Sequence, residues 1–276
     1  MRAIGGGWGV AALCALAVLV CGAKGGKEER HPLVIEVIGQ EANGQEAKPA
    51  AALEQAAPAR VLIYHTHTWE AYEMTEEAQY TPTETWRTKD ERYNMVRVGE
   101  ALAGALEERG FYVVHDTTAF EPPNLSDAYT RSLEMLKSRL EGGETYDYIL
   151  DVHRDAFSGN RNGDNCATGG DGVRRAYVMM LVGKGTGSTG AGFDERPDWP
   201  KNLALAQEIT QVMNETQPGI GREVKIKTGR FNQHVSPGAL LVEVGNNKNT
   251  LEEALVACEV IADALEQVHS SRSAAP

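Results

Sequence analysis

Short apolar runs alternate with amphipathic segments along the chain from Arg60 onward. Continuous apolar runs bounded by turn residues are typical of buried parallel strands. They predict strands at Val61–Tyr64, Phe111–Val114, Tyr146–Val152, Arg175–Val182 (a candidate edge strand), Val224–Ile226 and Leu240–Val244. Apolar residues at helical spacing predict helices from Met95 to a stop at Gly110 and at Tyr129–Leu140, Asn202–Met213 and Thr250–Val268. This alternation predicts an α/β domain with a mostly parallel sheet and helices on both faces.

The residues before Arg60 have a different composition. Gly5–Ala23 is uncharged and about long enough to cross a bilayer as a helix, which is typical of a signal peptide or a membrane anchor. We expect an uncleaved anchor at residues 1–23, a flexible tether at 24–59, a catalytic domain at 60–268 and a disordered tail at 269–276. The domain is then expected outside the cytoplasm, behind a single membrane-spanning segment.

The chain is acidic, with 27 Lys and Arg against 39 Asp and Glu and a formal net charge of -12. This balance argues against a duplex nucleic-acid partner, because such binders present a basic face to the phosphates. The four cysteines lack the CxxC spacing of a structural zinc or redox motif. A disulfide between Cys166 and Cys258 stays open, and a buried thiol at Cys258 is the favoured alternative.

Chemically active side chains gather at three predicted strand ends. They are His65, His67 and Glu70; His153, Arg154 and Asp155; and Glu243 to Asn246. Because the carboxyl ends of parallel strands share one edge of a sheet, these groups are expected to meet there. A catalytic zinc ion takes three nitrogen or oxygen ligands and keeps one position open for water. His67, Glu70 and His153 supply such a set, as in zinc peptidases of the carboxypeptidase type. Glu243 is the candidate general base.

Each of these clusters is ambiguous by itself. A single His at a strand end is more often a hydrogen-bonded polar residue than a ligand, whereas Asp151 and Asp155 are candidates to orient imidazoles. His65 and His67 face one side only if the strand continues through both, and the chain leaves strand geometry there. We therefore expect His67 as the ligand and His65 as its neighbour. Burial of Glu243 between two valines of an apolar strand costs free energy, and this cost favours a functional role for the residue.

Five sequence blocks, in order along the chain, resemble the signature of the stage II sporulation protein P family. The blocks are Val61–Tyr72, Tyr93–Gly99, Asp151–Ala156, Phe231–His234 and Ser236–Asn246, and the resemblance runs from about Arg60 to Leu265. Three positions depart from the family pattern. Trp69 and Ala71 stand in place of the more usual small polar and Ser/Ala choices, and Phe231 stands where Tyr is expected.

The resemblance implies a zinc-dependent N-acetylmuramoyl-L-alanine amidase of endospore formers, with an amidase- or carboxypeptidase-like fold and an additional endopeptidase activity. Its substrate is then peptidoglycan, cleaved between MurNAc and L-Ala during engulfment, with Zn2+ as the cofactor. The resemblance also implies an anchor in the mother-cell membrane, with the catalytic domain facing the intermembrane space. Two partners are implied with it: a lytic transglycosylase (stage II sporulation protein D) and a membrane scaffold (stage II sporulation protein M).

Carried over by position, the resemblance points to the same metal ligands and the same base. The resemblance also points to His65, which is expected to act beside Glu243 in catalysis. From their side-chain chemistry, Arg154, Asn232 and Asn246 are expected to contact the substrate. A competing alignment with the wider zinc amidase class, counted back from Gly110, makes Glu91 the carboxylate ligand in place of Glu70. We rank Glu70 first, because the family motif carries a Glu at that position.

Two other classes of function stay open at the level of sequence. The main alternative is a non-catalytic cell-wall binding or scaffold domain with a degenerate metal site. A cytosolic zinc deacylase acting on a small amide is disfavoured by the apolar N-terminal segment.

Overall fold

The computed structural model describes residues 57–156, 165–185 and 198–274. The predicted membrane segment Gly5–Ala23 and the predicted tether up to residue 56 lie outside these ranges. Of the helices in the described ranges, none is long and apolar enough to cross a membrane.

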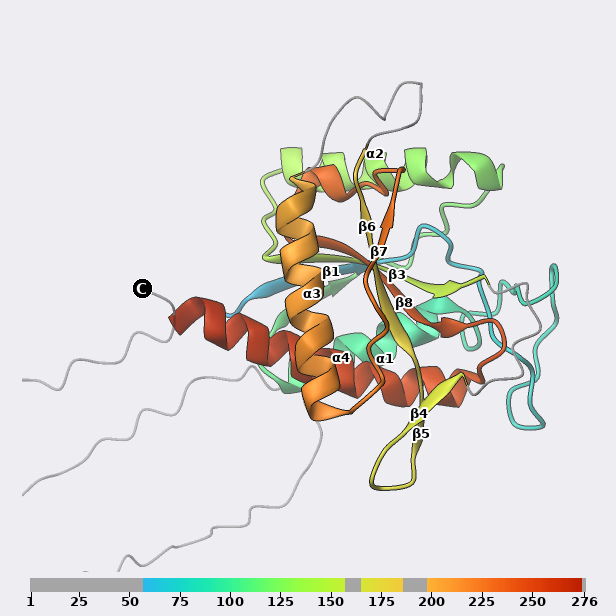
Figure 1. The fold of residues 1–276 in the computed structure, drawn as a ribbon. Coiled ribbons are helices and arrows are strands. Elements are labelled where there is room, and N and C mark those ends of the chain that lie inside the picture. The colour runs from blue at the N-terminus through green and yellow to red at the C-terminus, as the bar shows by residue number, and fades with distance from the viewer. Residues whose placement is uncertain (1–56, 157–164, 186–197, 275–276) are drawn as a thin grey trace, which may run out of the picture. The chain divides into compact units, whose positions relative to one another are not determined.

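A six-stranded sheet in the order β2-β1-β3-β8-β6-β7 organises the described residues (Figure 1). Its strands are β1 (Arg60–Tyr64), β2 (Tyr112–His115), β3 (Tyr148–Asp155), β6 (Val178–Gly183), β7 (Lys225–Lys227) and β8 (Ala239–Asn246). β1, β2, β3 and β8 run parallel to one another, β6 is antiparallel to β8, and β7 is parallel to β6. A separate antiparallel pair is formed by β4 (Cys166–Thr168) and β5 (Arg174–Ala176). The predicted, mostly parallel sheet is confirmed.

Helices cover both faces of this sheet, as predicted (Figure 1). They are α1 (Met95–Glu108), α2 (Ala128–Glu141), α3 (Trp199–Thr216) and α4 (Leu251–Ala274), with short 3-10 turns η1 (Leu125–Asp127) and η2 (Gln233–Val235). Val61 and Ile63 of β1 share a buried cluster with α1, α3 and α4, whereas Leu62 and Tyr64 share one with α2. Because successive strand residues point to opposite faces, a strand covered on both sides is apolar throughout.

Two strand predictions need correction. The single strand expected at Arg175–Val182 is interrupted at Tyr177, because its halves pair with different partners, β5 with β4 and β6 with β8. β6 is therefore an interior strand, with β8 and β7 on its two sides, and not an edge strand. β3 also continues past His153 to Asp155, whereas the sequence predicted its end at Val152, because it pairs with β8 through this region. His153 therefore lies inside its strand instead of following it, and Glu243 lies inside β8, as predicted.

The last helix is longer than expected. α4 continues to Ala274, where the sequence predicted a disordered tail from residue 269. Arg272 in this extension forms an ion pair of 2.6 Å with Glu208 of α3. A capping box begins α4, in which the amide of Glu253 donates to Thr250 Oγ1 and the amide of Thr250 donates to the Glu253 carboxylate.

The two cysteines in the described ranges are both buried. Cys166 and Cys258 are not joined by a disulfide. Cys258 lies in the core between α4 and α1, where its thiol is 3.7 Å from the carbonyl oxygen of Val98. The favoured expectation of a buried thiol at Cys258 is confirmed.

A pair of histidines packs against α1 at Gly99. A Cβ added to Gly99 would lie 2.4 Å from His115 Nε2 and 2.5 Å from His65 Nε2. Gly104, one turn and a half further along α1, has nothing within 4 Å of such an atom. The glycine at position 99 is therefore required by close approach, and the one at position 104 is not.

Gly99→Ala is expected to lower the free energy of unfolding by about 1–3 kcal/mol, because the added methyl group forces the buried histidine pair to shift. The matched control Gly104→Ala is expected to raise it by about 0.5–1 kcal/mol, since Ala favours a helix over Gly. Urea denaturation followed by circular dichroism measures both. Equal stabilisation by the two substitutions would contradict the close packing at Gly99.

Candidate active site

A buried carboxylate of β3 holds the turn that follows β1. Asp151 is 1% exposed, and its two oxygens accept hydrogen bonds from the Thr66 amide at 2.8 Å and the Thr66 hydroxyl at 2.7 Å. The turn closes where the amide of Glu70 donates to the carbonyl of His67 at 3.3 Å. Asp151 therefore determines where the chain places His67 and Glu70 after the strand ends.

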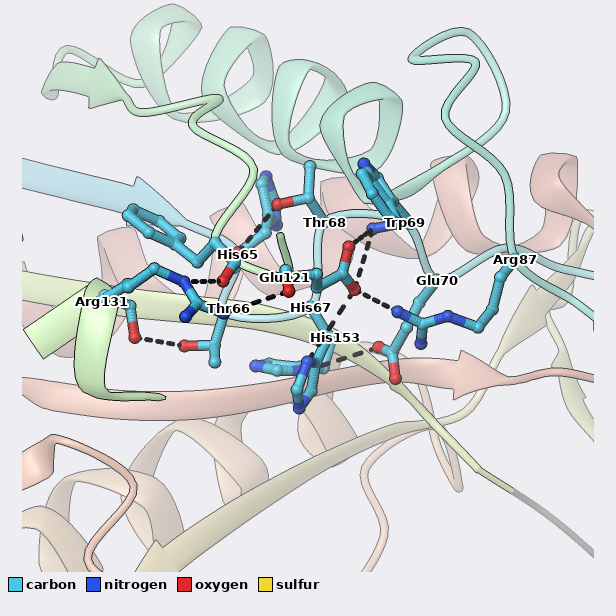
Figure 2. Close-up of polar contacts among 12 residues, drawn as sticks. His65, Thr66, His67, Thr68, Trp69, Glu70, Arg87, Glu121, Arg131 and His153 are labelled. Carbon is cyan, nitrogen blue, oxygen red and sulfur yellow. Dashed lines mark hydrogen bonds and ion pairs between the residues drawn. The ribbon is translucent and has the colours of Figure 1, made fainter. Parts of the chain in front are cut away.

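His67, Glu70 and His153 lie next to one another at this edge of the sheet (Figure 2). The ring centroids of His67 and His153 are 5.3 Å apart, and the rings are nearly perpendicular at 82°. Glu70 Oε2 lies 3.5 Å from His153 Nδ1. Tyr129 of α2 contacts both rings, at centroid distances of 5.5 Å to His67 and 6.5 Å to His153. The three residues predicted as metal ligands are thus neighbours in the fold.

Charge is distributed unevenly over this cluster. Burial and the nearby charge of His153 lower the pKa of His67 to about 4, so its ring is neutral at pH 7. Burial opposes a charged His153, but Asp151, 2.8 Å from Nε2, and Glu70 together raise the pKa of His153 well above its ordinary value. Burial raises the pKa of Glu70, yet the hydrogen bond and charge of His153 and the charge of Arg154 outweigh it and lower the pKa to about 2. In the protein without metal, the two carboxylates thus favour the protonated form of His153, and a bound cation would take the place of that proton.

Glu243 faces this cluster from the neighbouring strand. It lies directly opposite His153 in the pairing of β3 with β8, so both side chains project from the same face of the sheet. The residue is partly exposed, but its Oε2 is buried and has no hydrogen-bond partner among the described residues. Burial raises the pKa of Glu243 to about 8, with the charge of His153 opposing the rise and that of Glu70 adding to it. A carboxyl group that titrates near neutrality can both accept and release a proton.

The donor types at this site fit zinc. Within the described ranges, no group of three or more His, Cys, Asp or Glu side chains has the arrangement of a metal-binding group. Two imidazoles and a carboxylate nevertheless lie side by side, which is a ligand set that zinc takes, and His67 Nδ1 is buried without a hydrogen-bond partner among the described residues. Two carboxylates, Glu70 and Asp151, lie within 3.5 Å of the His153 ring nitrogens, and their negative charge favours a cation at this site. By donor chemistry and charge the cluster is a candidate zinc site.

Glu121 is a site residue that the sequence reasoning missed. It is 3% exposed, accepts a hydrogen bond of 3.1 Å from the Trp69 amide, and forms an ion pair with Arg87 (Figure 2). Its Oε1 lies 3.9 Å from His67 Nδ1. Burial raises the pKa of Glu121, and the charge of Arg87 opposes this rise. The available signal was an acidic residue inside the otherwise apolar, proline-containing segment Phe120–Pro123.

His65 lies beside the site and supports it. The side chain is fully buried, and its Nδ1 is 2.8 Å from the carbonyl oxygen of Val152. A carbonyl only accepts, so Nδ1 donates, and Nε2 of neutral His65 accepts from Nε2 of His115 at 2.9 Å. Burial and the neighbouring His115 lower the pKa of His65 to about 3. With both nitrogens engaged inside the protein, His65 does not occupy the substrate-facing position expected from the sequence.

Two predicted substrate contacts are likewise engaged inside the protein. Arg154 is buried; its amide donates to Glu70 Oε2 at 3.3 Å and its Nε donates to the carbonyl of Ala71 at 3.1 Å. Asn232 is 4% exposed and donates from Nδ2 to the carbonyl of Tyr129 at 2.9 Å. Arg154 therefore positions Glu70, and Asn232 positions the α2 residue that packs on both imidazoles.

The remaining candidates lie further from the imidazoles. Asn246, at the end of β8, lines a cleft. Asp155 lines the same cleft and forms an ion pair of 3.5 Å with Lys225. Glu91, the competing carboxylate ligand, is an exposed residue of the turn before α1.

The fold and the site together define an α/β protein with a cluster of histidines and carboxylates at the carboxyl ends of neighbouring parallel strands. The chain belongs to the stage II sporulation protein P (SpoIIP) family, whose sequence pattern matches residues 23–266. Stage II sporulation protein P of Bacillus subtilis (strain 168) is 26% identical over 255 residues, which cover 88% of this chain and 59% of that protein. The chain thus spans less than two thirds of the length of this curated relative.

Three solved structures have a distant likeness to the chain. The catalytic domain of CD27L endolysin targeting Clostridia Difficile is 15% identical with a TM-score of 0.45, over 77% of this chain and 97% of its own. The N-acetylmuramoyl-L-alanine amidase from Clostridium difficile 630 is 15% identical with a TM-score of 0.43, over 80% of this chain and 100% of its own. The catalytic domain of CwlV, an N-acetylmuramoyl-L-alanine amidase from Bacillus(Paenibacillus) polymyxa var.colistinus, is 13% identical with a TM-score of 0.41, over 78% and 98%. The family assignment rests on the sequence match.

The buried carboxyl of Glu243 is expected to make stability fall with rising pH when unfolding is measured in a chelator. The group has an ordinary pKa of 4.5 in the unfolded chain and about 8 in the folded chain, so the folded state holds an extra proton between these values. The stabilising contribution is complete below about pH 4.5 and is lost as the pH rises through about 8. Glu243→Gln should therefore lose less stability than the wild type between pH 5 and pH 8. Parallel losses in urea titrations of the two proteins would contradict this.

Proposed function

We propose that this chain is a zinc-dependent peptidoglycan hydrolase that cleaves the amide between MurNAc and L-Ala. One observation carries the proposal: His67, Glu70 and His153 lie together, and Glu243 stands opposite His153 across the paired strands. The substrate follows from the resemblance of the sequence blocks to the SpoIIP family, and the chemistry follows from the side chains. The same chemistry extends to amide crosslinks between stem peptides.

The side chains divide the work of hydrolysis between holding a cation and moving a proton. His67, Glu70 and His153 would hold the zinc ion, which supplies positive charge that acidifies water and polarises the scissile carbonyl. Glu243 takes a proton as the water oxygen bonds to the carbonyl carbon. The C–N bond then breaks, and Glu243 delivers the proton to the leaving nitrogen. The oxygen of the water ends in the new carboxylic acid, and the transferred proton ends on the new amine.

The proposal includes a cellular setting. Residues 1–23 anchor the protein in the mother-cell membrane, and the hydrolase acts on peptidoglycan in the intermembrane space during engulfment. The uncharged apolar run Gly5–Ala23 supports the anchor. The family resemblance supports stage II sporulation proteins D and M as partners.

Glu243→Gln is expected to reduce release of products from purified sacculi by at least about 100-fold, because the amide can neither take nor return the proton. Zinc content, measured by mass spectrometry of the metal, should stay at the wild-type level. Lys227→Ala, an exposed change on β7, is the control and should leave both readouts unchanged. Wild-type cleavage by Glu243→Gln would overturn the base assignment. A wild-type protein with no zinc and no chelator-sensitive release would favour the non-catalytic cell-wall binding alternative.

Glu70→Gln and Glu91→Gln separate the two candidate carboxylate ligands. Glu70 is buried against His153 and Arg154, whereas Glu91 is exposed in the turn before α1. We expect Glu70→Gln to weaken zinc binding by more than about tenfold, since a neutral amide is a poor ligand for zinc, and Glu91→Gln to bind zinc like the wild type. Competition with a fluorescent chelator measures both affinities. The reverse order would assign the ligand to Glu91.

A further inference from the structure

A cleft of about 500 Å³ lies at the carboxyl end of β8, where Gly245 and Asn246 line it. Met179 of β6, Asp155 and Lys225 also line it. This volume lies within the range of pockets that bind small ligands, which is about 300–1,000 Å³. The cleft is separate from the histidine cluster, although residues of the same strands line both.

The register of the sheet places the cleft on the far side of Glu243 from His153. Glu243 lies opposite His153 of β3 on one side and opposite Met179 of β6 on the other. Side chains at paired positions project from the same face, so His153, Glu243 and Met179 form a row across the sheet. Lys225 shares this face, because it lies opposite Leu181, two residues after Met179. A molecule that extends from His153 past Glu243 therefore enters the cleft.

Two cationic side chains, Arg222 and Lys225, line the cleft together with two acidic ones, Asp155 and Glu223. Arg222 lies with its guanidinium 4.7 Å from the ring centroid of Tyr177, and its amide donates to the carbonyl of Val178 at 2.8 Å. Lys225 Nζ lies 3.5 Å from Asp155 Oδ2. Both cations are exposed to solvent, and both line the cleft. Guanidinium and ammonium groups in such positions bind carboxylates through charge-assisted hydrogen bonds.

The orientation of the scissile amide between the histidines and Glu243 determines which part of the substrate extends into this cleft. In amide hydrolysis the leaving nitrogen receives its proton from the general acid, so this nitrogen must lie next to Glu243. The acyl carbon lies toward His67 and His153, and the group bonded to the nitrogen extends the opposite way, toward Met179. We propose that the cleft binds the stem peptide of peptidoglycan, the part attached to the leaving nitrogen, and that Arg222 and Lys225 bind its free carboxylates. This inference rests on the proposed amidase function.

Steady-state cleavage of two synthetic muropeptides tests the inference. One is an N-acetylmuramoyl tripeptide with free side-chain and terminal carboxylates, and the other is the same compound with these groups converted to amides. Arg222→Ala and Lys225→Ala in the full chain should each raise KM for the acidic muropeptide roughly tenfold with little change in kcat, and should leave KM for the amidated one nearly unchanged. Arg222→Lys should restore most of the affinity, and Lys227→Ala should behave as the wild type.

Unchanged KM values in both alanine variants of an active enzyme would overturn the inference while leaving the amidase function intact. A binding measurement further separates the inference about the cleft from the proposed amidase function. Calorimetry with the free tripeptide and the Glu243→Gln protein needs no turnover, and the dissociation constant should rise about tenfold when Arg222→Ala is added. An equal dissociation constant with and without Arg222→Ala would also overturn the inference. Peptide binding that depends on Arg222 in a wild-type protein without hydrolytic activity would support the cleft and overturn the amidase function.

Discussion

The carboxylate of Asp151 is the contact on which the arrangement of this site depends. It is buried in β3, accepts two hydrogen bonds from Thr66, and lies 2.8 Å from His153 Nε2. A buried charge is costly unless it is paired and hydrogen-bonded. The partners of Asp151 are Thr66, in the turn after β1, and His153, in β3 itself. One carboxylate thus holds both the turn that carries His67 and Glu70 and the ring of His153.

The surrounding residues extend this arrangement in two directions. On the β1 side, Glu121 accepts a hydrogen bond from the Trp69 amide, and the Arg154 amide donates one to the Glu70 carboxylate. These two bonds hold neighbouring residues of the turn. On the β8 side, parallel pairing sets Glu243 opposite His153 and antiparallel pairing sets Met179 opposite Glu243. Because β6 runs antiparallel to β8, the residue beside Glu243 on this side is Met179, near the amino end of β6, and Met179 lines the cleft.

Much of the fold follows from local pattern. The apolar run at Val61–Tyr64 corresponds closely to β1, because a strand buried on both faces is apolar throughout. The helical spacing after Met95 corresponds closely to α1, because a helix buried on one face repeats its apolar residues at that spacing. The candidate ligands could also be found from sequence, since carboxyl ends of parallel strands converge. The roles of His65, Arg154 and Asn232 could not, because polar residues beside a site look the same in sequence whether they face a substrate or a backbone carbonyl.

The α/β class, the family and the convergence of His67, His153 and Glu243 at one edge of the sheet could be predicted from the sequence alone. The antiparallel direction of β6 inside the sheet, the extension of β3 past His153, and the approach of Glu121 to His67 from a segment more than 50 positions away became visible only in the folded structure. The physical reason is the same in each case. Hydrophobic periodicity reports which face of an element is buried, whereas strand neighbours and partners of buried charges are set by contacts between distant segments.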